Sequence, residues 1–264
     1  MDASRRSMLR RAALSIPPVR RLITQRDEAR ARAKKLEKQL QALGARSGPG
    51  LGYVFVVTYG RSGSTLLQGI LSSIPGYLIR GENGDALYSL YKFHSKLEKV
   101  RASHGKGRRL PVTSPWFGID GYPSDRAVTQ IRQLALTTLL RPEADTRVVG
   151  YKEIRWWHDD WREYLVFLQA VFPGAKFVIN TRDRQDVSAS KWWADRDPDT
   201  VTATLDKYER ILDGVAGELG SGAYRVHYND YVADPSTLRG LFDWLGEPFD
   251  EARVRDVMNT RHSY

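Results

Sequence analysis

The stretch Tyr53–Ile74, YVFVVTYGRSGSTLLQGILSSI, decides the fold of this chain. Its first part, Tyr53–Tyr59, is apolar and rich in β-branched and aromatic residues, which is typical of a buried parallel strand. Small residues then interrupt the apolar pattern over Gly60–Thr65. Apolar residues return at helical spacing over Leu66–Ile74, until Pro75–Gly76 ends the helix. The sequence therefore predicts a buried strand, a tight turn and a helix.

This turn has the composition of an anion site. A small-residue turn that opens a helix presents several backbone N–H groups together, beside the positive end of the helix dipole. Hydroxyl groups and a fixed positive charge add to this field, so we expect the loop to bind a phosphate-like group through Arg61, Ser62, Gly63, Ser64 and Thr65. The alternative is a strand–turn–helix without a ligand, in which these donors would have no anionic acceptor.

The turn departs from the phosphate loop of nucleotide triphosphatases, G-x-x-x-x-G-K-[ST]. Gly60 and Gly63 lie too close together, no lysine precedes Ser64, and the basic residue is Arg61. With its flanks, TYGRSGSTLL, the turn resembles the 5′-phosphosulfate loop of sulfotransferases that use 3′-phosphoadenosine-5′-phosphosulfate (PAPS). The resemblance implies the P-loop-like α/β fold of that family, with three layers in which helices flank a central parallel sheet.

A second segment, Phe177–Trp193 with the sequence FVINTRDRQDVSASKWW, resembles the 3′-phosphate motif of the same family. That motif runs from a strand through Arg-[DN]-x to a helix with a serine eight residues after the arginine, and Arg182 and Ser190 have this spacing. An arginine fork and a serine can converge there on one phosphate. The alternative is a helix cap, in which Asp183 or Asp186 begins the helix and Arg182 pairs with a carboxylate.

A late segment, YRVHYNDYVADPSTLRGLFDWLG at residues 224–246, resembles a further strand of the family and its Y-E-D-L-x-x-D-P sequence. The tyrosine at the position of Tyr228 can lie near the adenine in that family. Asn229 replaces the usual glutamate and Tyr231 the usual leucine, so this part departs from the family pattern. The resemblance covers residues 51–248 in the expected order.

The resemblance also implies which residues react. In the tyrosylprotein and bacterial carbohydrate branches, a glutamate at a similar distance from the loop acts as general base, and here it would be Glu82, 21 residues after Arg61. Lys152, comparable to a lysine of the tyrosylprotein branch, would neutralise charge on the transferring group together with Arg61. His158 and Glu153 are alternative bases, and ordinary surface positions are the alternative for Glu82 and Lys152.

Strands and helices alternate through the body of the chain, which indicates parallel βαβ units. The pattern predicts strands at 147–154, 176–180 and 224–228, and helices at 125–140, 160–172 and 200–219. Ligands gather at the carboxyl ends of such strands, where the phosphate loop, Lys152 and Arg182 all lie. We interpret the basic and proline-containing segment 86–125 as an irregular, acceptor-binding insertion, with a solvated loop as the alternative.

The predicted reaction uses PAPS, releases 3′-phosphoadenosine 5′-phosphate (PAP) and requires no metal ion. The acceptor would be a hydroxyl group of a carbohydrate or another small metabolite. Two alternatives stay open. A small-molecule kinase using ATP would need a lysine before Ser64, which the sequence lacks. A non-catalytic nucleotide-binding scaffold would join a partner through Leu22–Leu43.

Charge divides the chain near residue 47. Residues 1–47 contain 13 of the 41 basic residues (Lys and Arg) and four of the 31 acidic residues (Asp and Glu). The remainder of the chain contains 28 basic and 27 acidic residues. We predict a basic N-terminal extension, 1–47, followed by a near-neutral sulfotransferase domain, 48–264. Nucleic-acid enzymes carry basic charge across their body, so we expect no specific nucleic-acid partner. The extension is suited to peripheral contact with an anionic membrane.

Within the extension, Leu22–Leu43 places an apolar residue at every seventh position, which predicts a short coiled coil and a homo-oligomer formed through it. Three heptads are marginal, so a solvated single helix is the alternative. No apolar run approaches the length of a membrane span, and the arginine-rich N-terminus lacks the apolar centre of a signal peptide. These features, with the absence of cysteine, predict a cytoplasmic protein.

Overall fold

The computed structural model describes residues 50–105, 107, 109–190 and 193–260, together with Gln25, Glu28 and Arg32. The predicted extension, with its heptad segment Leu22–Leu43, lies outside the described residues apart from these three, which are exposed and helical. The sheet and helices belong to a unit that begins at Pro49. No helix in the described part of the chain combines the length and the apolar character needed to cross a bilayer.

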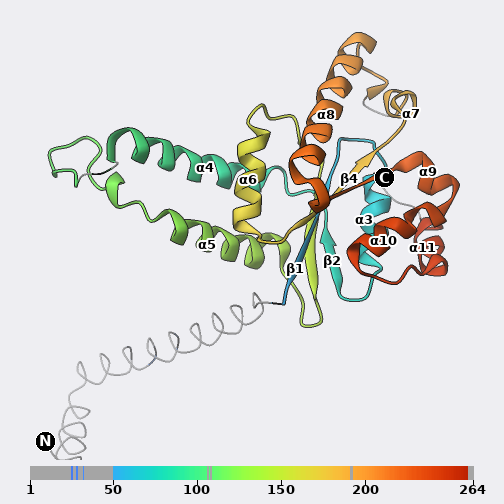
Figure 1. Cartoon of the computed structure of the whole chain (residues 1–264), viewed down its shortest axis with the longest axis horizontal. Coiled ribbons are helices and arrows are strands. Elements are labelled where there is room, and N and C mark those ends of the chain that lie inside the picture. The colour runs from blue at the N-terminus through green and yellow to red at the C-terminus, as the bar shows by residue number, and fades with distance from the viewer. Residues whose placement is uncertain are drawn as a thin grey trace, which may run out of the picture. The chain divides into compact units, whose positions relative to one another are not determined.

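A five-stranded, wholly parallel sheet forms the centre of this unit (Figure 1). The strands lie in the order β2-β3-β1-β4-β5 and span Tyr77–Arg80, Val148–Glu153, Gly52–Val57, Lys176–Thr181 and Ala223–His227. The register pairs Val57 of β1 with Glu153 of β3 and Ile179 of β4. The carboxyl ends of these three strands therefore lie side by side, where ligands of parallel sheets bind.

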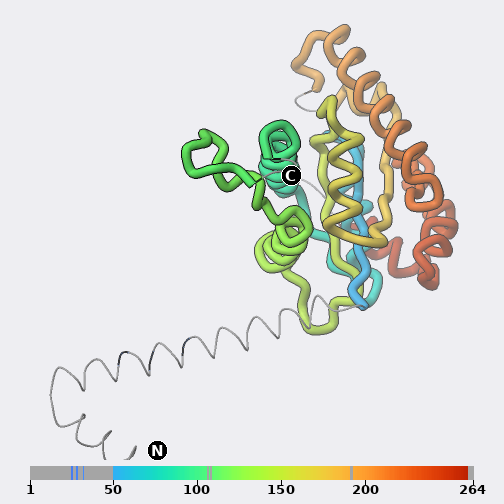
Figure 2. The backbone as a smooth tube through the Cα atoms, turned by 60° about the vertical axis from the view of Figure 1, so that its left-hand side comes forward, coloured from blue at the N-terminus to red at the C-terminus, as the bar shows by residue number. Residues whose placement is uncertain are grey.

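Helices cover both faces of the sheet and complete the three layers (Figures 1 and 2). They are α3 (Ser64–Ser72), α4 (Ala86–Val100), α5 (Ser124–Ala135), α6 (Trp161–Val171), α7 (Arg184–Ser188), α8 (Pro198–Leu219), α9 (Tyr228–Ala233), α10 (Arg239–Leu245) and α11 (Glu251–Met258). From β1, Tyr53, Phe55 and Val57 pack with α4, α5, α6 and α8, whereas Val54 and Val56 pack with α3, α10 and α11. Burial on both faces explains the continuous apolar run of β1 and confirms the predicted α/β fold.

Two segments differ from the expectation. Tyr77–Arg80, which is not among the predicted strands, is the edge strand β2, whose Tyr77 and Ile79 are buried. Four alternating residues are too short a pattern to distinguish a strand from a loop. The segment 86–125 is not irregular either, because α4 fills its first part and a π-helical turn, Arg101–Gly105, continues it.

The sequence analysis did not predict α4, because the exposed side of this helix carries several lysines. Its core contacts come from Leu87 and Tyr91, which lie one turn apart and are both buried. Lys92, counted in the predicted basic patch, instead pairs with Asp160 at 2.8 Å. The first half of the long insertion is thus helical and packs against α6.

Candidate active site

A cavity of about 600 Å³ at the carboxyl ends of the strands collects most of the predicted site residues. Among the residues that line it are the predicted Arg61, Gly63, Ser64, Thr65, Glu82, Lys152, Arg182 and Tyr228. Met258 and Thr260 also line it, and the sequence analysis missed both. Met258 is the last residue of α11 and Thr260 follows the helix; the sequence carries no recognisable motif there, so no signal could have indicated them.

The predicted phosphate loop connects β1 to α3 through two left-handed residues, Arg61 with φ 68° and Gly63 with φ 77°. A Cβ atom at Gly63 would lie 1.9 Å from a ring carbon of Tyr228, so glycine alone fits this position. The helix α3 then begins without a side-chain cap and without an acidic residue in its first turn. Its positive end therefore meets the cavity wall, as an anion site requires.

Buried hydrogen bonds stabilise this loop on the side away from the cavity. The Thr58 hydroxyl lies 2.6 Å from Ser62 Oγ and 2.7 Å from the Asn180 carbonyl oxygen, and the Asn180 amide donates to the Ser62 carbonyl at 2.8 Å. Ser62 is fully buried and does not line the cavity, although we expected it to contact the ligand. Its side chain stabilises the loop, and any contact with a ligand must come from its main chain.

The two predicted phosphate motifs meet directly. Arg61 Nε donates to Ser190 Oγ at 2.9 Å across 129 residues of sequence, and Arg182 Nη1 donates to the Arg61 carbonyl oxygen at 3.2 Å. Trp193 Nε1 donates to the Gly60 carbonyl oxygen at 3.1 Å. Ser190 follows α7, which ends two residues earlier, and does not line the cavity. The motifs therefore form one hydrogen-bonded unit, in which the loop residue Arg61 contacts both Ser190 and Arg182.

Arg182 has unused hydrogen-bonding capacity at the cavity. Its guanidinium carbon lies 4.5 Å from the ring centroid of Tyr228, and its Nη2 lies 3.5 Å from Asp186 Oδ2. The alternative interpretation, in which Arg182 pairs with a carboxylate at the helix start, is thus met only by this long contact with the exposed Asp186. Arg182 Nε is buried and has no hydrogen-bond partner in the described part of the chain. Buried donors are normally paired, so this nitrogen favours an anionic ligand.

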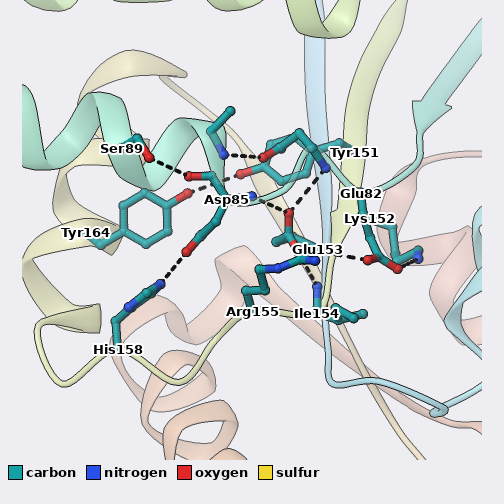
Figure 3. A network of polar contacts seen from close by, with 12 residues as sticks. Glu82, Asp85, Ser89, Tyr151, Lys152, Glu153, Ile154, Arg155, His158 and Tyr164 are labelled. Atoms are coloured by element: carbon teal, nitrogen blue, oxygen red, sulfur yellow. Dashed lines mark hydrogen bonds and ion pairs between the residues drawn. The ribbon is translucent and has the colours of Figure 1, made fainter. Parts of the chain in front are cut away.

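Glu82 and Lys152, from separate strand ends, form a close ion pair (Figure 3). Lys152 Nζ lies 2.6 Å from Glu82 Oε1, and Arg155 Nη1 lies 3.4 Å from Glu82 Oε2. The Lys152 side chain is almost fully buried, whereas about one third of the Glu82 side chain is exposed. The cavity wall therefore places a carboxylate beside a buried cation, and both predicted reactive groups reach the same space.

Glu153 anchors the segment that carries Glu82 (Figure 3). Its Oε2 accepts hydrogen bonds from the backbone N–H groups of Asn83 at 3.3 Å and Asp85 at 3.2 Å. Its Oε1 accepts from the backbone N–H of Ile154 and from Arg155, both at 2.9 Å. Glu153 is buried and does not line the cavity, so it lies in a structural position and not in that of the alternative base.

His158, the other alternative base, lies behind the same segment. Its Nε2 is 2.6 Å from Asp85 Oδ2, and its ring stacks on Tyr88 with centroids 3.4 Å apart. Burial raises the pKa of Asp85 and outweighs the lowering effect of His158. His158 does not line the cavity, which leaves Glu82 as the carboxylate that faces it.

The arrangement can hold an anionic ligand and accept a proton. The α3 N-terminus and the cations Arg61, Lys152 and Arg182 surround the space that Glu82 reaches. Fixed cations stabilise charge that develops during group transfer, and a carboxylate can act as general base. No group of three or more His, Asp or Glu side chains that could hold a metal ion occurs among the described residues.

Solved structures similar to this chain include three sulfotransferases or sulfotransferase domains. A solved sulfotransferase domain from the olefin synthase of Synechococcus PCC 7002 is 21% identical, with a TM-score of 0.50 over 81% of this chain and 85% of that domain. A sulfotransferase domain from the curacin biosynthetic pathway is 16% identical over 80% and 79% of the two chains, with a TM-score of 0.45. A sulfotransferase from Mycobacterium avium is 14% identical over 80% and 68%, with a TM-score of 0.44.

The comparison with curated protein sequences found no match. The olefin synthase domain supports the fold. The family assignment rests on a family model described as "Sulfotransferase family", which matches residues 54–251 and therefore spans both phosphate motifs, Glu82 and Lys152. The predicted family is thereby confirmed: the chain belongs to the sulfotransferase family.

Proposed function

We propose that this enzyme transfers the sulfuryl group of PAPS to a hydroxyl group of a carbohydrate or another small metabolite. The observation that carries the proposal is the joining of an anion loop, Arg182, Lys152 and Glu82 in one cavity. PAPS bears anionic groups at both its 5′ and 3′ positions, so a protein that binds it needs two anion sites within reach of one nucleoside. The α3 N-terminus and Arg182 are such a pair.

The residues present fit this donor. The backbone N–H groups of the loop, with Ser64 and Thr65, would hold the 5′-phosphosulfate, because the α3 N-terminus lacks any acidic residue. Arg182 would hold the 3′-phosphate, and its buried, unpartnered Nε supports this assignment. Ser190, which we expected to share this role, would act through its hydrogen bond with Arg61. Tyr228, which packs on the loop and under Arg182, would lie beside the adenine.

Glu82 would remove the proton of the acceptor hydroxyl, which is a poor nucleophile while it keeps that proton. Its Oε1 is bound to Lys152, whereas Oε2 has only the longer contact to Arg155, so Oε2 is the better placed proton acceptor. Arg61 and Lys152 would balance negative charge on the transferring sulfuryl group and the leaving phosphate.

Transfer from labelled donors tests the proposal. The full chain is incubated with PAPS labelled in its sulfuryl sulfur and a panel of saccharides and small hydroxyl metabolites, and the labelled product is identified by mass. A parallel reaction contains γ-labelled ATP and magnesium. We expect label from PAPS on an acceptor hydroxyl and none from ATP. Transfer from ATP without transfer from PAPS would contradict the proposal and favour a kinase.

A further inference from the structure

The connection between α4 and α5 exposes apolar side chains that the proposed reaction does not use. Val112, Trp116 and Phe117 are 76%, 42% and 56% exposed. The helices α4 and α5 run side by side away from the sheet, and their connection lies at the outer end of the pair (Figures 1 and 2). We refer to residues 109–119 at this end as the tip.

The tip is a sequence of hydrogen-bonded turns. Ser114 N donates to the Pro111 carbonyl oxygen at 2.9 Å, and Phe117 N donates to the Ser114 carbonyl oxygen at 3.1 Å. Leu110 is buried and anchors the start of the tip, while the His104 ring stacks on Trp116 with centroids 4.4 Å apart. The turns therefore leave these apolar side chains exposed to water. Such exposure is unfavourable and is not needed for folding, so it indicates an interaction surface.

The sequence that leads into the tip is basic. No Asp or Glu lies between Glu98 and Asp120, whereas the same interval contains Lys99, Arg101, Lys106, Arg108 and Arg109. Lys99 and Arg109 are exposed. The remainder of the chain after the extension is nearly neutral, so this cluster is a local feature. Within the tip itself, the exposed Arg109 adds positive charge to the segment that carries the exposed apolar side chains.

We propose that the tip inserts its apolar side chains into the interface of an anionic membrane. Exposed Trp and Phe flanked by Lys and Arg are the composition of interfacial anchors, in which apolar groups enter the headgroup boundary and basic groups attract anionic lipids. Three projecting side chains offer too little area for a stable protein interface. This binding surface is independent of the cavity and of the reaction proposed for it.

A fluorescent label reports insertion at the tip directly, because the chain contains no cysteine. Thr113→Cys places a single thiol between Val112 and Trp116, and Val166→Cys places one on α6, at a side chain that is 65% exposed. Each full-length variant carries an environment-sensitive nitrobenzoxadiazole label. Each is mixed with phosphatidylcholine vesicles with or without phosphatidylserine. We expect a blue shift at position 113 with phosphatidylserine and none at position 166.

The basic extension is present in both labelled proteins, so its own attraction to the vesicles is controlled. If the extension alone binds, the proteins sediment with the vesicles while the label at position 113 stays in water, and the proposal is wrong. The proposal also fails if neither protein sediments with phosphatidylserine vesicles. A blue shift of equal size with double-stranded DNA would assign the tip to nucleic acid and overturn it as well.

Substitutions in the Thr113→Cys background assign the binding to individual side chains. The double variant W116S/F117S should lower the vesicle partition coefficient by about tenfold or more, because two large apolar side chains are lost from the interface. Arg109→Ser should lower it by about fivefold on phosphatidylserine vesicles, as expected for one basic residue near the surface. Leu134→Ser, at an exposed apolar position of α5, should leave it unchanged. Equal effects of W116S/F117S and Leu134→Ser would contradict the proposal.

Discussion

At the scale of single residues, the contact between Glu82 and Lys152 defines the proposed chemistry. Glu82→Gln keeps the size of the side chain but removes its ability to accept a proton, so kcat for sulfuryl transfer should fall about 10²–10⁴-fold. The affinity for PAP should change little, because Glu82 is not a proposed phosphate ligand. Single-turnover kinetics beside PAP calorimetry measures both, with the exposed Glu163→Gln as the control. Near-normal kcat in Glu82→Gln would assign the base to another group.

Glu153 should act through Glu82 by holding its segment in place. In Glu153→Gln one carboxylate oxygen becomes an NH₂ group, so either the hydrogen bonds from Asn83 and Asp85 or those from Ile154 and Arg155 lose their acceptor. A displaced base should lower kcat about 10–10²-fold with little change in KM for PAPS. The decisive comparison is the double variant with Glu82→Gln, which should be no slower than Glu82→Gln alone. Multiplied losses would show that Glu153 acts independently.

Sequence motifs predicted which residue types gather at the site, but not which of them face the ligand. Ser62 belongs to the motif, yet it lies between two left-handed residues, and its hydroxyl is buried against Thr58. Ser190 reaches Arg61 and not the cavity wall. Glu153, named as an alternative base, directly follows Lys152 in β3. Because side chains alternate along a strand, Lys152 faces the cavity and Glu153 points to the opposite side. The direction in which each side chain points depends on the backbone angles, which a sequence motif does not specify.

At the scale of elements, one ion pair joins the start of β3 to the segment after α10. Arg147 donates to both carboxylate oxygens of Glu247 at 2.6 Å, and the Tyr77 hydroxyl donates to Oε1 at 3.1 Å. The hydrogen bonds from Arg147 lower the pKa of Glu247 below its ordinary value of 4.5. A lowered carboxyl pKa stabilises the folded state above the unfolded-state pKa, and the stabilisation is lost as the pH falls through the folded-state pKa.

Glu247→Gln should therefore lower the free energy of unfolding by about 1 kcal/mol near neutral pH, a small value because Arg147 is half exposed. The difference from the parent protein should shrink as the pH falls from about 4.5 toward the lower folded-state pKa of Glu247, below which the parent carboxyl is also neutral. Urea unfolding at a series of pH values measures it. Glu218→Gln, from an exposed pair with Arg162, is the control. A difference independent of pH would refute the role of this charge.

Element prediction succeeded where apolar spacing was long and unbroken. The strand β1 and the helices α3, α6 and α8 follow such runs, and they occur where the sequence predicts them. The helix α4 and the strand β2 were missed for different reasons. In α4 the exposed lysines outnumber the core residues, and β2 offers only four residues of pattern. Both elements depend on tertiary burial for their stability more than on local propensity.

At the scale of the whole molecule, the parallel sheet and its two helical layers followed from the alternation of elements and from the resemblance of two motifs. The carboxyl ends of β1, β3 and β4 then bring Arg61, Lys152 and Arg182 together, although more than a hundred residues separate the first from the last. Met258 and Thr260 reach the same cavity without a sequence signal, because only folding returns the late helices to it.

The central claim is that this cavity binds a nucleotide with a 3′-phosphate, and ligand-dependent thermal unfolding of the full chain tests it most directly. At about 100 times its Kd, PAP should raise the unfolding temperature by about 5–10 °C, because a ligand that binds only the folded state stabilises it. ATP with magnesium, which lacks the 3′-phosphate, should have little effect. Arg182→Ala should abolish the shift, whereas Arg184→Ala, whose side chain pairs with Asp206 outside the cavity, should retain it. Stabilisation by ATP with magnesium and not by PAP, or an unchanged PAP shift in Arg182→Ala, would contradict the account.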